Sequence, residues 1–279
     1  MIREIKTRKP AVAGQFYPGD ERSLSEMLDK LFYEAEKDIG SINGVVNALV
    51  APHAGYVFSG KQAAKAYACL KDHSYDLVCI ISPSHREYFP AISVYPGESY
   101  ITPMGKCLID DEARKTALSC EGIVPSLEGH RSEHALEVQL PFIQKILGNI
   151  RILPMVMGDQ SAQSINETSE CVKKLYEKYH DKVLFVASSD LSHFHPAHIA
   201  KEMDGEFIRL LNEANSEMIF QKLQDDELEA CGGGPILSIL KGLDISSNEI
   251  FTLGYSHSGQ VLSDNDSVVG YTSAVMIKG

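Results

Sequence analysis

Three histidines stand directly after apolar runs of the kind that form buried strands. His53 lies in APHAGY, His85 in SPSH and His193 in SSDLSH. Ligands of open α/β sheets bind outside the carboxyl ends of the strands, so these histidines are expected in one crevice. Imidazole is a common metal ligand and, when unligated, a base that works near neutral pH. One such histidine would more often be a surface or capping residue, but three at strand ends predict a metal or acid–base site.

A cysteine in a glycine-rich turn offers a ligand of a different kind. Cys231 lies in ACGGGP, where the glycines permit close approach of the backbone and Pro235 suits the first turn of a helix. A thiol near a helix N-terminus is biased toward thiolate, which binds metals or attacks electrophiles. Thiolate with imidazole suits iron, copper or zinc far better than magnesium or calcium. The alternatives are an ordinary loop thiol and a phosphate-binding turn, although the lysine of a P-loop is absent.

The segment EHALEVQLPF concentrates further polar groups next to an apolar stripe. If Glu133–Leu147 forms a helix, Glu133, His134 and Glu137 share one face, because residues three and four apart are neighbours. Carboxylates placed in this way either hold ligand imidazoles in one tautomer or bind substrate. The alternative is a solvated acidic face. Tyr56 stands close to a predicted ligand in the sequence and is a further candidate for substrate contact.

Asp190 precedes His193 by three residues and is expected to orient its ring. A neutral, unligated His193 would then act as a general base. His195 and His198 follow in FHPAH, which is an alternative metal-binding run. Pro196 is expected to start a helix that carries His198 away from the strand end, so the general-base interpretation is favoured.

The elements that must position these residues alternate between strand and helix patterns. Continuous apolar strands separated by helices predict a largely parallel sheet covered on both faces, and two strands at the end of the chain suggest a mixed sheet. We therefore expect α/β class: one α/β/α sandwich domain over residues 1–279 with a mixed, largely parallel central sheet. The predicted strands are 45–51, 77–81, 92–95, 150–156, 183–187, 250–255 and 267–277. The predicted helices are 22–36, 59–70 with Ser59 as its cap, 133–147, 162–179, two between 199 and 223, and 235–240.

Charge and composition exclude several classes of function. The formal net charge of −12 argues against nucleic acid and against anionic membranes as partners. No apolar run resembles a signal peptide, and none approaches the roughly 20 residues of a membrane span. The six cysteines are scattered without a CxxC pair, which predicts a reducing, cytoplasmic setting.

Taken in order, these motifs resemble the Memo family, whose bacterial and archaeal members are called AmmeMemoRadiSam system protein B. Seven segments carry the resemblance almost from end to end: GQFYP, APHAGY, SPSH, EHALEVQLPF, SSDLSH, CGGGP and SVVGY. The family's fold is similar to that of class III extradiol dioxygenases. The resemblance implies that His53, His85 and Cys231 are the metal ligands, and that His193, with Asp190 beside it, matches the dioxygenase catalytic histidine. Cysteine then stands where the dioxygenases use glutamate.

The resemblance implies one metal ion, with Fe(II) expected and copper or zinc as alternatives. The expected function is that of a non-haem dioxygenase type oxidoreductase acting on an unidentified small molecule or modified peptide. One alternative is a non-catalytic metal-binding protein that binds a peptide or a radical SAM or AMMECR-type partner. Another is a zinc-dependent hydrolase in which His193 activates water. The thiolate in place of glutamate keeps these alternatives open, because a fold does not fix a function.

Overall fold

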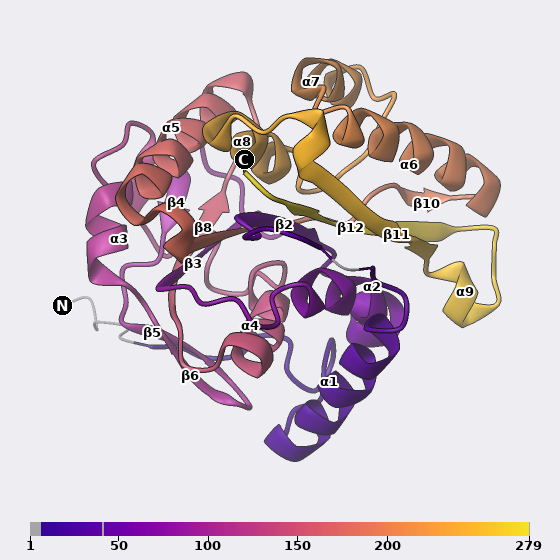
Figure 1. Cartoon of the computed structure of the whole chain (residues 1–279), viewed down its shortest axis with the longest axis horizontal. Coiled ribbons are helices and arrows are strands. Elements are labelled where there is room, and N and C mark those ends of the chain that lie inside the picture. The colour runs from indigo at the N-terminus through magenta and orange to yellow at the C-terminus, as the bar shows by residue number, and fades with distance from the viewer. Residues whose placement is uncertain (1–6, 41, 279) are drawn as a thin grey trace.

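The computed structural model describes residues 7–40 and 42–278, and within them a nine-stranded sheet carries helices on both faces (Figure 1). This confirms the predicted α/β/α sandwich with a mixed sheet. Eight strands follow one another across the sheet, and a ninth, β11 (Ile250–His257), pairs with β12. The order is β10 (His193–His195), β12 (Val268–Met276), β2 (Ala48–Ala51), β9 (Val183–Ser188), β3 (Leu77–Pro83), β8 (Arg151–Met157), β4 (Ile92–Val94) and β7 (Ile123–Pro125).

The middle of the sheet is parallel. β2 pairs with β9, β9 with β3 and β3 with β8 in this orientation, so their carboxyl ends lie at one edge. All residues of β2, β3 and β9 are buried, as expected for apolar strands covered on both faces. The outer pairs β12 with β2, β11 with β12 and β4 with β8 are antiparallel. The sequence pattern predicted this mixture from the strands at the end of the chain.

Two layers of helices cover the sheet (Figure 1). Their apolar faces form one hydrophobic cluster on each side of the strands. Of the helices in the described part of the chain, none is both long and apolar enough to cross a bilayer. One layer comprises α3 (Asp111–Ala117), α5 (Ala162–Tyr179), α6 (Ala197–Asn212), α7 (Ser216–Gln224) and α8 (Gly233–Leu243). The other comprises α1 (Glu21–Ala35), α2 (Tyr56–Ala68) and α4 (Leu140–Leu147).

The predicted helix 133–147 is wrong in its first half. The chain makes a short 3₁₀ turn at Glu137–Gln139 and only then enters α4, with a proline in its first turn. Glu133 explains the difference, because its side chain accepts the backbone N–H groups of His134 and Ala135 and bends the chain there. A second difference is that α2 begins three residues before Ser59, whose hydroxyl does not cap it.

Short elements with weak periodicity were missed. The stretch between residues 96 and 132, predicted as a polar loop, forms a hairpin of β5 (Ser99–Thr102) and β6 (Gly105–Leu108), then α3 and β7. β5 also pairs with β1 (Thr7–Arg8), which ties the N-terminal segment to the domain. The strand β10 and the short helix α9 (Gly259–Leu262) were missed as well. The remaining predicted elements lie within three residues of their predicted bounds.

Candidate metal centre

The strand ends bring three predicted ligands together. The donor atoms of His53, His85 and Cys231 all lie within 4.8 Å of one another. His53 follows β2, His85 follows β3, and Cys231 precedes α8, so the parallel edge and a helix N-terminus meet here. The thiol sulfur of Cys231 is 3.1 Å from His53 Nε2, and the His53 and His85 rings are 5.1 Å apart. The crevice predicted from the strand ends therefore exists in the structure.

The separation of the Cys231 and His53 donor atoms fits two ligands of a single soft or borderline metal ion. Metal–sulfur and metal–nitrogen bonds of about 2.3 and 2.1 Å place neighbouring ligand atoms roughly 3.1 to 3.6 Å apart. The 3.1 Å separation between Cys231 Sγ and His53 Nε2 agrees with this range. Two imidazoles and one thiolate suit iron, copper or zinc. An ion held by three protein ligands keeps open positions for a substrate.

A chain of buried hydrogen bonds fixes the tautomer of His53. Gln139 Oε1 accepts from the Tyr67 hydroxyl at 2.9 Å, which leaves its Nε2 group to donate to Ser188 Oγ at 2.8 Å. Ser188 donates its own hydrogen to the Ala135 carbonyl at 2.6 Å. His53 Nδ1, 2.9 Å from Ser188 Oγ, must therefore be the donor in their hydrogen bond. His53 Nε2 is then left unprotonated, which is the form that binds a metal.

We expect Ser188→Ala to weaken metal binding about 10- to 100-fold, the usual effect of losing a hydrogen-bond partner of a ligand histidine. The reason is that Nδ1 loses its acceptor, so the tautomer protonated on Nε2 becomes accessible. Zinc affinity measured by competition with a coloured chelator at neutral pH tests this. Ser82→Ala is the matched control, because Ser82 is equally buried but its hydroxyl has no hydrogen-bond partner. Equal zinc affinity in Ser188→Ala and Ser82→Ala would contradict the assigned role.

Glu133 holds the second ligand histidine. Its Oε1 lies 3.0 Å from His85 Nδ1, and its Oε2 accepts the backbone N–H of His85 at 2.5 Å. Burial alone would raise the pKa of the Glu133 carboxyl, but hydrogen bonds from His134 and His85 more than offset this, and the pKa is lowered. The carboxylate thus leaves His85 Nε2 available to a metal ion, in the arrangement common around ligand imidazoles. This is one of the two roles that the sequence predicted for Glu133.

His134 supplies the third imidazole packed in the crevice. Its ring lies 5.4 Å from that of His53 and 4.8 Å from that of His85. Its Nδ1 is buried and lies 3.1 Å from Glu133 Oε1. His85, Glu133 and His134 form a second group of possible metal ligands. Phe16 covers the outer side of His134, with ring centroids 4.8 Å apart.

Asp190 links two of the ligand-bearing loops. Its Oδ1 accepts the backbone N–H of His53 at 2.7 Å, and its Oδ2 is 3.9 Å from His53 Nε2. Its backbone carbonyl accepts the N–H of Cys231 at 3.3 Å. Burial raises the pKa of the Asp190 carboxyl to about 6. His193 lies beyond these contacts on β10, where its backbone N–H donates to Glu229 at 2.8 Å, and its orientation by Asp190 stays a prediction.

Glycine allows the Cys231 loop to reach the end of β9. A Cβ at Gly232 would lie 2.1 Å from the carbonyl oxygen of Ser188, so no larger residue fits without movement. The backbone N–H of Gly232 donates to Ser189 Oγ at 2.9 Å, and that of Asp190 points to Cys231 Sγ at 3.2 Å. The close approach predicted from the glycine run is present.

The protonation of Cys231 differs from the prediction. Burial raises the pKa of the Cys231 thiol, and the nearby Asp190 carboxylate raises it further. The backbone donors around the sulfur and the adjacent start of α8 do not reverse this desolvation. The thiol is therefore protonated until a cation replaces the proton, and metal binding is expected to release it.

Glu137 and Tyr56 lie away from the ligands. Glu137 is fully buried and pairs with Arg8 of the N-terminal segment, while its carboxylate also accepts from the Tyr17 hydroxyl at 2.5 Å. The Tyr56 hydroxyl donates to the Val138 carbonyl at 2.7 Å inside the protein. Both residues therefore support the loop that carries His134. Ser188, Gln139 and Arg8 were missed, although the first two stand within the segments SSDLSH and EHALEVQLPF.

The alternative metal-binding run FHPAH gains no support from the described residues. His195 Nε2 pairs with Glu229 Oε1 at 2.8 Å, and His198 is exposed on α6. Neither takes part in the groups of potential ligands that the described part of the chain contains.

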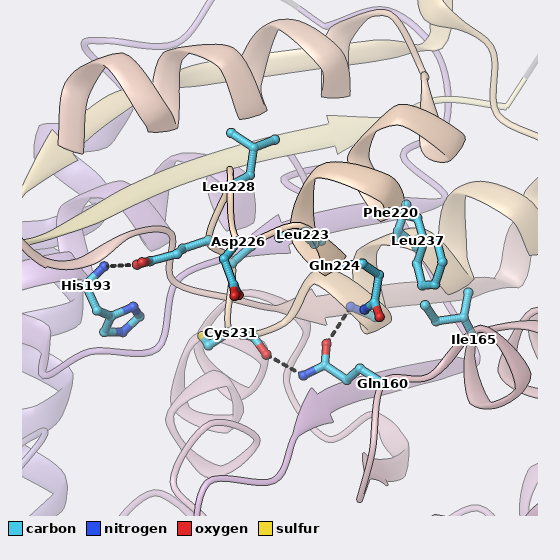
Figure 2. A pocket seen from close by; sticks show the side chains of 13 residues that line it. Gln160, Ile165, His193, Phe220, Leu223, Gln224, Asp226, Leu228, Cys231 and Leu237 are labelled. Atoms are coloured by element: carbon cyan, nitrogen blue, oxygen red, sulfur yellow. Dashed lines mark hydrogen bonds between the residues drawn. The ribbon is translucent and has the colours of Figure 1, made fainter. Parts of the chain in front are cut away.

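A pocket of about 360 Å³ opens beside Cys231 and His193. Figure 2 shows both side chains at one end of it, with apolar side chains of α5, α7 and α8 at the other. His53 and His85 do not line this pocket. It therefore approaches the ligand cluster from the side of the thiol.

Known proteins resemble this chain over nearly its whole length. The family model described as Memo-like protein matches residues 8–275. A MEMO1 family protein of Methanosarcina barkeri is 37% identical over 275 residues, covering 96% of this chain and 99% of the relative. A MEMO1 family protein of Thermoplasma volcanium is 33% identical over 270 residues, with 96% and 97% covered. Another from Thermococcus onnurineus is 34% identical over 294 residues, with 97% and 99% covered.

Proposed function

The chain belongs to the Memo family, and from this premise we propose that it is a metal-dependent oxidoreductase of the non-haem dioxygenase type. His53, His85 and Cys231 hold one ferrous ion, and the substrate is a small molecule or a modified peptide. The observation that carries the proposal is the combination of three clustered donors with a pocket that reaches Cys231 and the unligated His193. A facial set of three ligands with open positions is the arrangement that non-haem iron oxygenases use.

The residues around the site have separate roles in the proposed reaction. A ferrous ion bound there supplies redox chemistry toward oxygen and a place for a chelating substrate. His193 takes a proton from a substrate hydroxyl, since it lines the pocket and its hydrogen bond to Glu229 uses only the backbone N–H. Glu133 and Ser188 hold the ligand rings in their metal-binding tautomers. All six cysteines are free thiols, which supports a reducing, cytoplasmic setting for this chemistry.

Hydrolysis with zinc is a second candidate. Two histidines and one cysteine also form a zinc site with an open fourth position. His193 would then take a proton from water instead of from a substrate hydroxyl. Oxygen consumption separates the two candidates, because hydrolysis uses none.

We expect His193→Ala to retain metal and to lose about 10²- to 10⁴-fold in turnover, the usual effect of removing a general base. The assay is oxygen uptake by protein reconstituted anaerobically with ferrous iron and then given a panel of catechols and oxygen. His198→Ala is the matched control, because His198 is exposed on α6 away from the ligands. Unchanged turnover in His193→Ala would refute the base assignment. Bound iron with no oxygen uptake on any catechol would favour a metal-holding protein that binds a peptide or protein partner.

A further inference from the structure

The pocket beside Cys231 has an apolar wall on one side and two carboxylates on another, and this lining determines which ligands can bind. One wall is apolar and comes from α5, α7, α8 and the loop before α8 (Figure 2). Three of its side chains are almost completely buried, so the wall is part of the packed core and has a fixed shape. A ligand limb placed against it gains about 0.8 kcal/mol for each buried CH₂ group. The wall consists of Ile165, Phe220, Leu223, Leu228 and Leu237.

The charges around the pocket are all negative. Asp226 and Glu229 line it, and no lysine or arginine does so among the described residues. In Figure 2 the Asp226 carboxylate points into the space between His193 and Gln224. Glu229 is held at the His193 end by the backbone N–H of that residue, at 2.8 Å. A negative group on a ligand would therefore meet two carboxylates, one of which pairs with His195, and no lysine or arginine in the pocket lining.

The nearest basic side chain on α7 is already engaged. Lys222 lies 2.7 Å from Glu227 and 4.0 Å from Glu206, so its charge is directed away from the pocket. Gln160 cannot turn toward a ligand carboxylate either. Its Nε2 donates to the Cys231 carbonyl at 2.7 Å, and its Oε1 accepts from Gly234 at 2.5 Å.

We propose that this pocket takes an apolar limb of a metal-chelating substrate, that the limb carries a neutral or cationic group, and that the pocket rejects carboxylate-bearing analogues. The inference rests on the proposed function, because it assumes that the chelating head of the substrate reaches the metal next to Cys231. It adds a substrate class: Asp226 and Glu229, on the His193 and Cys231 side of the pocket, discriminate by the charge that the limb carries. Close like charges oppose binding and opposite charges favour it.

The test uses three catechols that share a head and differ in the end group: dopamine, ethylcatechol and dihydroxyphenylacetate. Each displaces nitrocatechol, whose absorbance reports metal coordination, from zinc-loaded protein, so no turnover is required. We expect dopamine to bind at least about tenfold more tightly than dihydroxyphenylacetate, with ethylcatechol between them, since charges a few ångströms apart are worth this much. Added salt should narrow the difference.

Asp226→Asn is the decisive variant. Its backbone φ is 55°, a conformation that asparagine tolerates as well as aspartate, so the turn is preserved. We expect Asp226→Asn to reduce the preference for dopamine several-fold, while Asp225→Asn, an exposed neighbour outside the pocket, leaves it unchanged. Equal binding of amine and carboxylate by the wild type, or an unchanged preference in Asp226→Asn, would overturn the inference. If no catechol binds, the proposed function fails with it; if the ranking holds without oxygen uptake in the iron protein, only the enzymatic proposal fails.

Discussion

Cys231→Ala and His53→Ala are each expected to lose the metal ion. Either change removes one of three donors and leaves a cluster that holds an ion by two imidazoles or by one imidazole and the thiol. Loss of a residue that only hydrogen-bonds to a metal ligand lowers metal affinity about 10- to 100-fold. Loss of a ligand itself should therefore lower metal affinity more than about 100-fold. After anaerobic reconstitution with ferrous iron and gel filtration, wild type should retain about one ion per chain and both variants almost none.

Two further variants make this measurement specific. Cys69→Ala removes a thiol that hydrogen-bonds within α2 and should leave the metal content unchanged. His134→Ala distinguishes the two groups of possible ligands, because His134 belongs only to the group with Glu133. If Cys231→Ala keeps its iron and His134→Ala loses it, the ion occupies that second group, and the assignment of the thiol is wrong.

The sequence was sufficient to place His53 and His85. Both follow apolar strands, and the carboxyl ends of parallel strands share one edge whatever their order in the sheet. The order itself was not predictable, since it depends on pairings between distant segments. Cys231 could be linked to this edge only through the family resemblance. Its approach depends on Gly232 passing the end of β9, a contact between residues more than forty positions apart in the chain.

The sequence did not predict the protonation state of Cys231 or the separate roles of Glu133 and Glu137. Both depend on burial and on contacts with residues far away in the chain. The helix N-terminus next to Cys231 indicated a thiolate, but burial raises the pKa of the thiol, and burial cannot be inferred from one local motif. Glu133 and Glu137 looked equivalent on a helical face. Glu133 instead bends the chain and binds His85, whereas Glu137 pairs with Arg8, which is 129 positions away.

Glu137→Ala should be the most destabilising single change outside the core. The carboxylate and the Arg8 guanidinium are both buried and form an ion pair, so truncation leaves a buried charge without its partner. The backbone N–H groups of Ala11 and Val12 and the Tyr17 hydroxyl lose their acceptor as well. Breaking a buried pair from one side costs about 3–5 kcal/mol. We expect the free energy of unfolding to fall by this amount in urea titrations.

The effect should begin locally, because Glu137 anchors the segment from Ala11 to Tyr17, which packs against the candidate metal centre through Phe16. Phe16 lies in this segment, packs on His134 and accepts the backbone N–H of Tyr56 at 2.8 Å. Hydrogen exchange should therefore accelerate first at Ala11 and Val12, whose amides donate to Glu137.

An exposed ion pair serves as the control. It shows whether the loss of stability comes from breaking a buried pair or from removing any glutamate charge. Glu36 pairs with Lys71 at 3.0 Å on the surface, and Glu36→Ala should change stability by less than about 1 kcal/mol. In a double-mutant cycle, Arg8→Ala should cost much less in the Glu137→Ala background than in wild type, because the ion pair is already broken there and the second substitution removes the unpaired charge. If the two substitutions are additive, the ion pair does not anchor the segment, and the backbone donors to Glu137 must account for its burial.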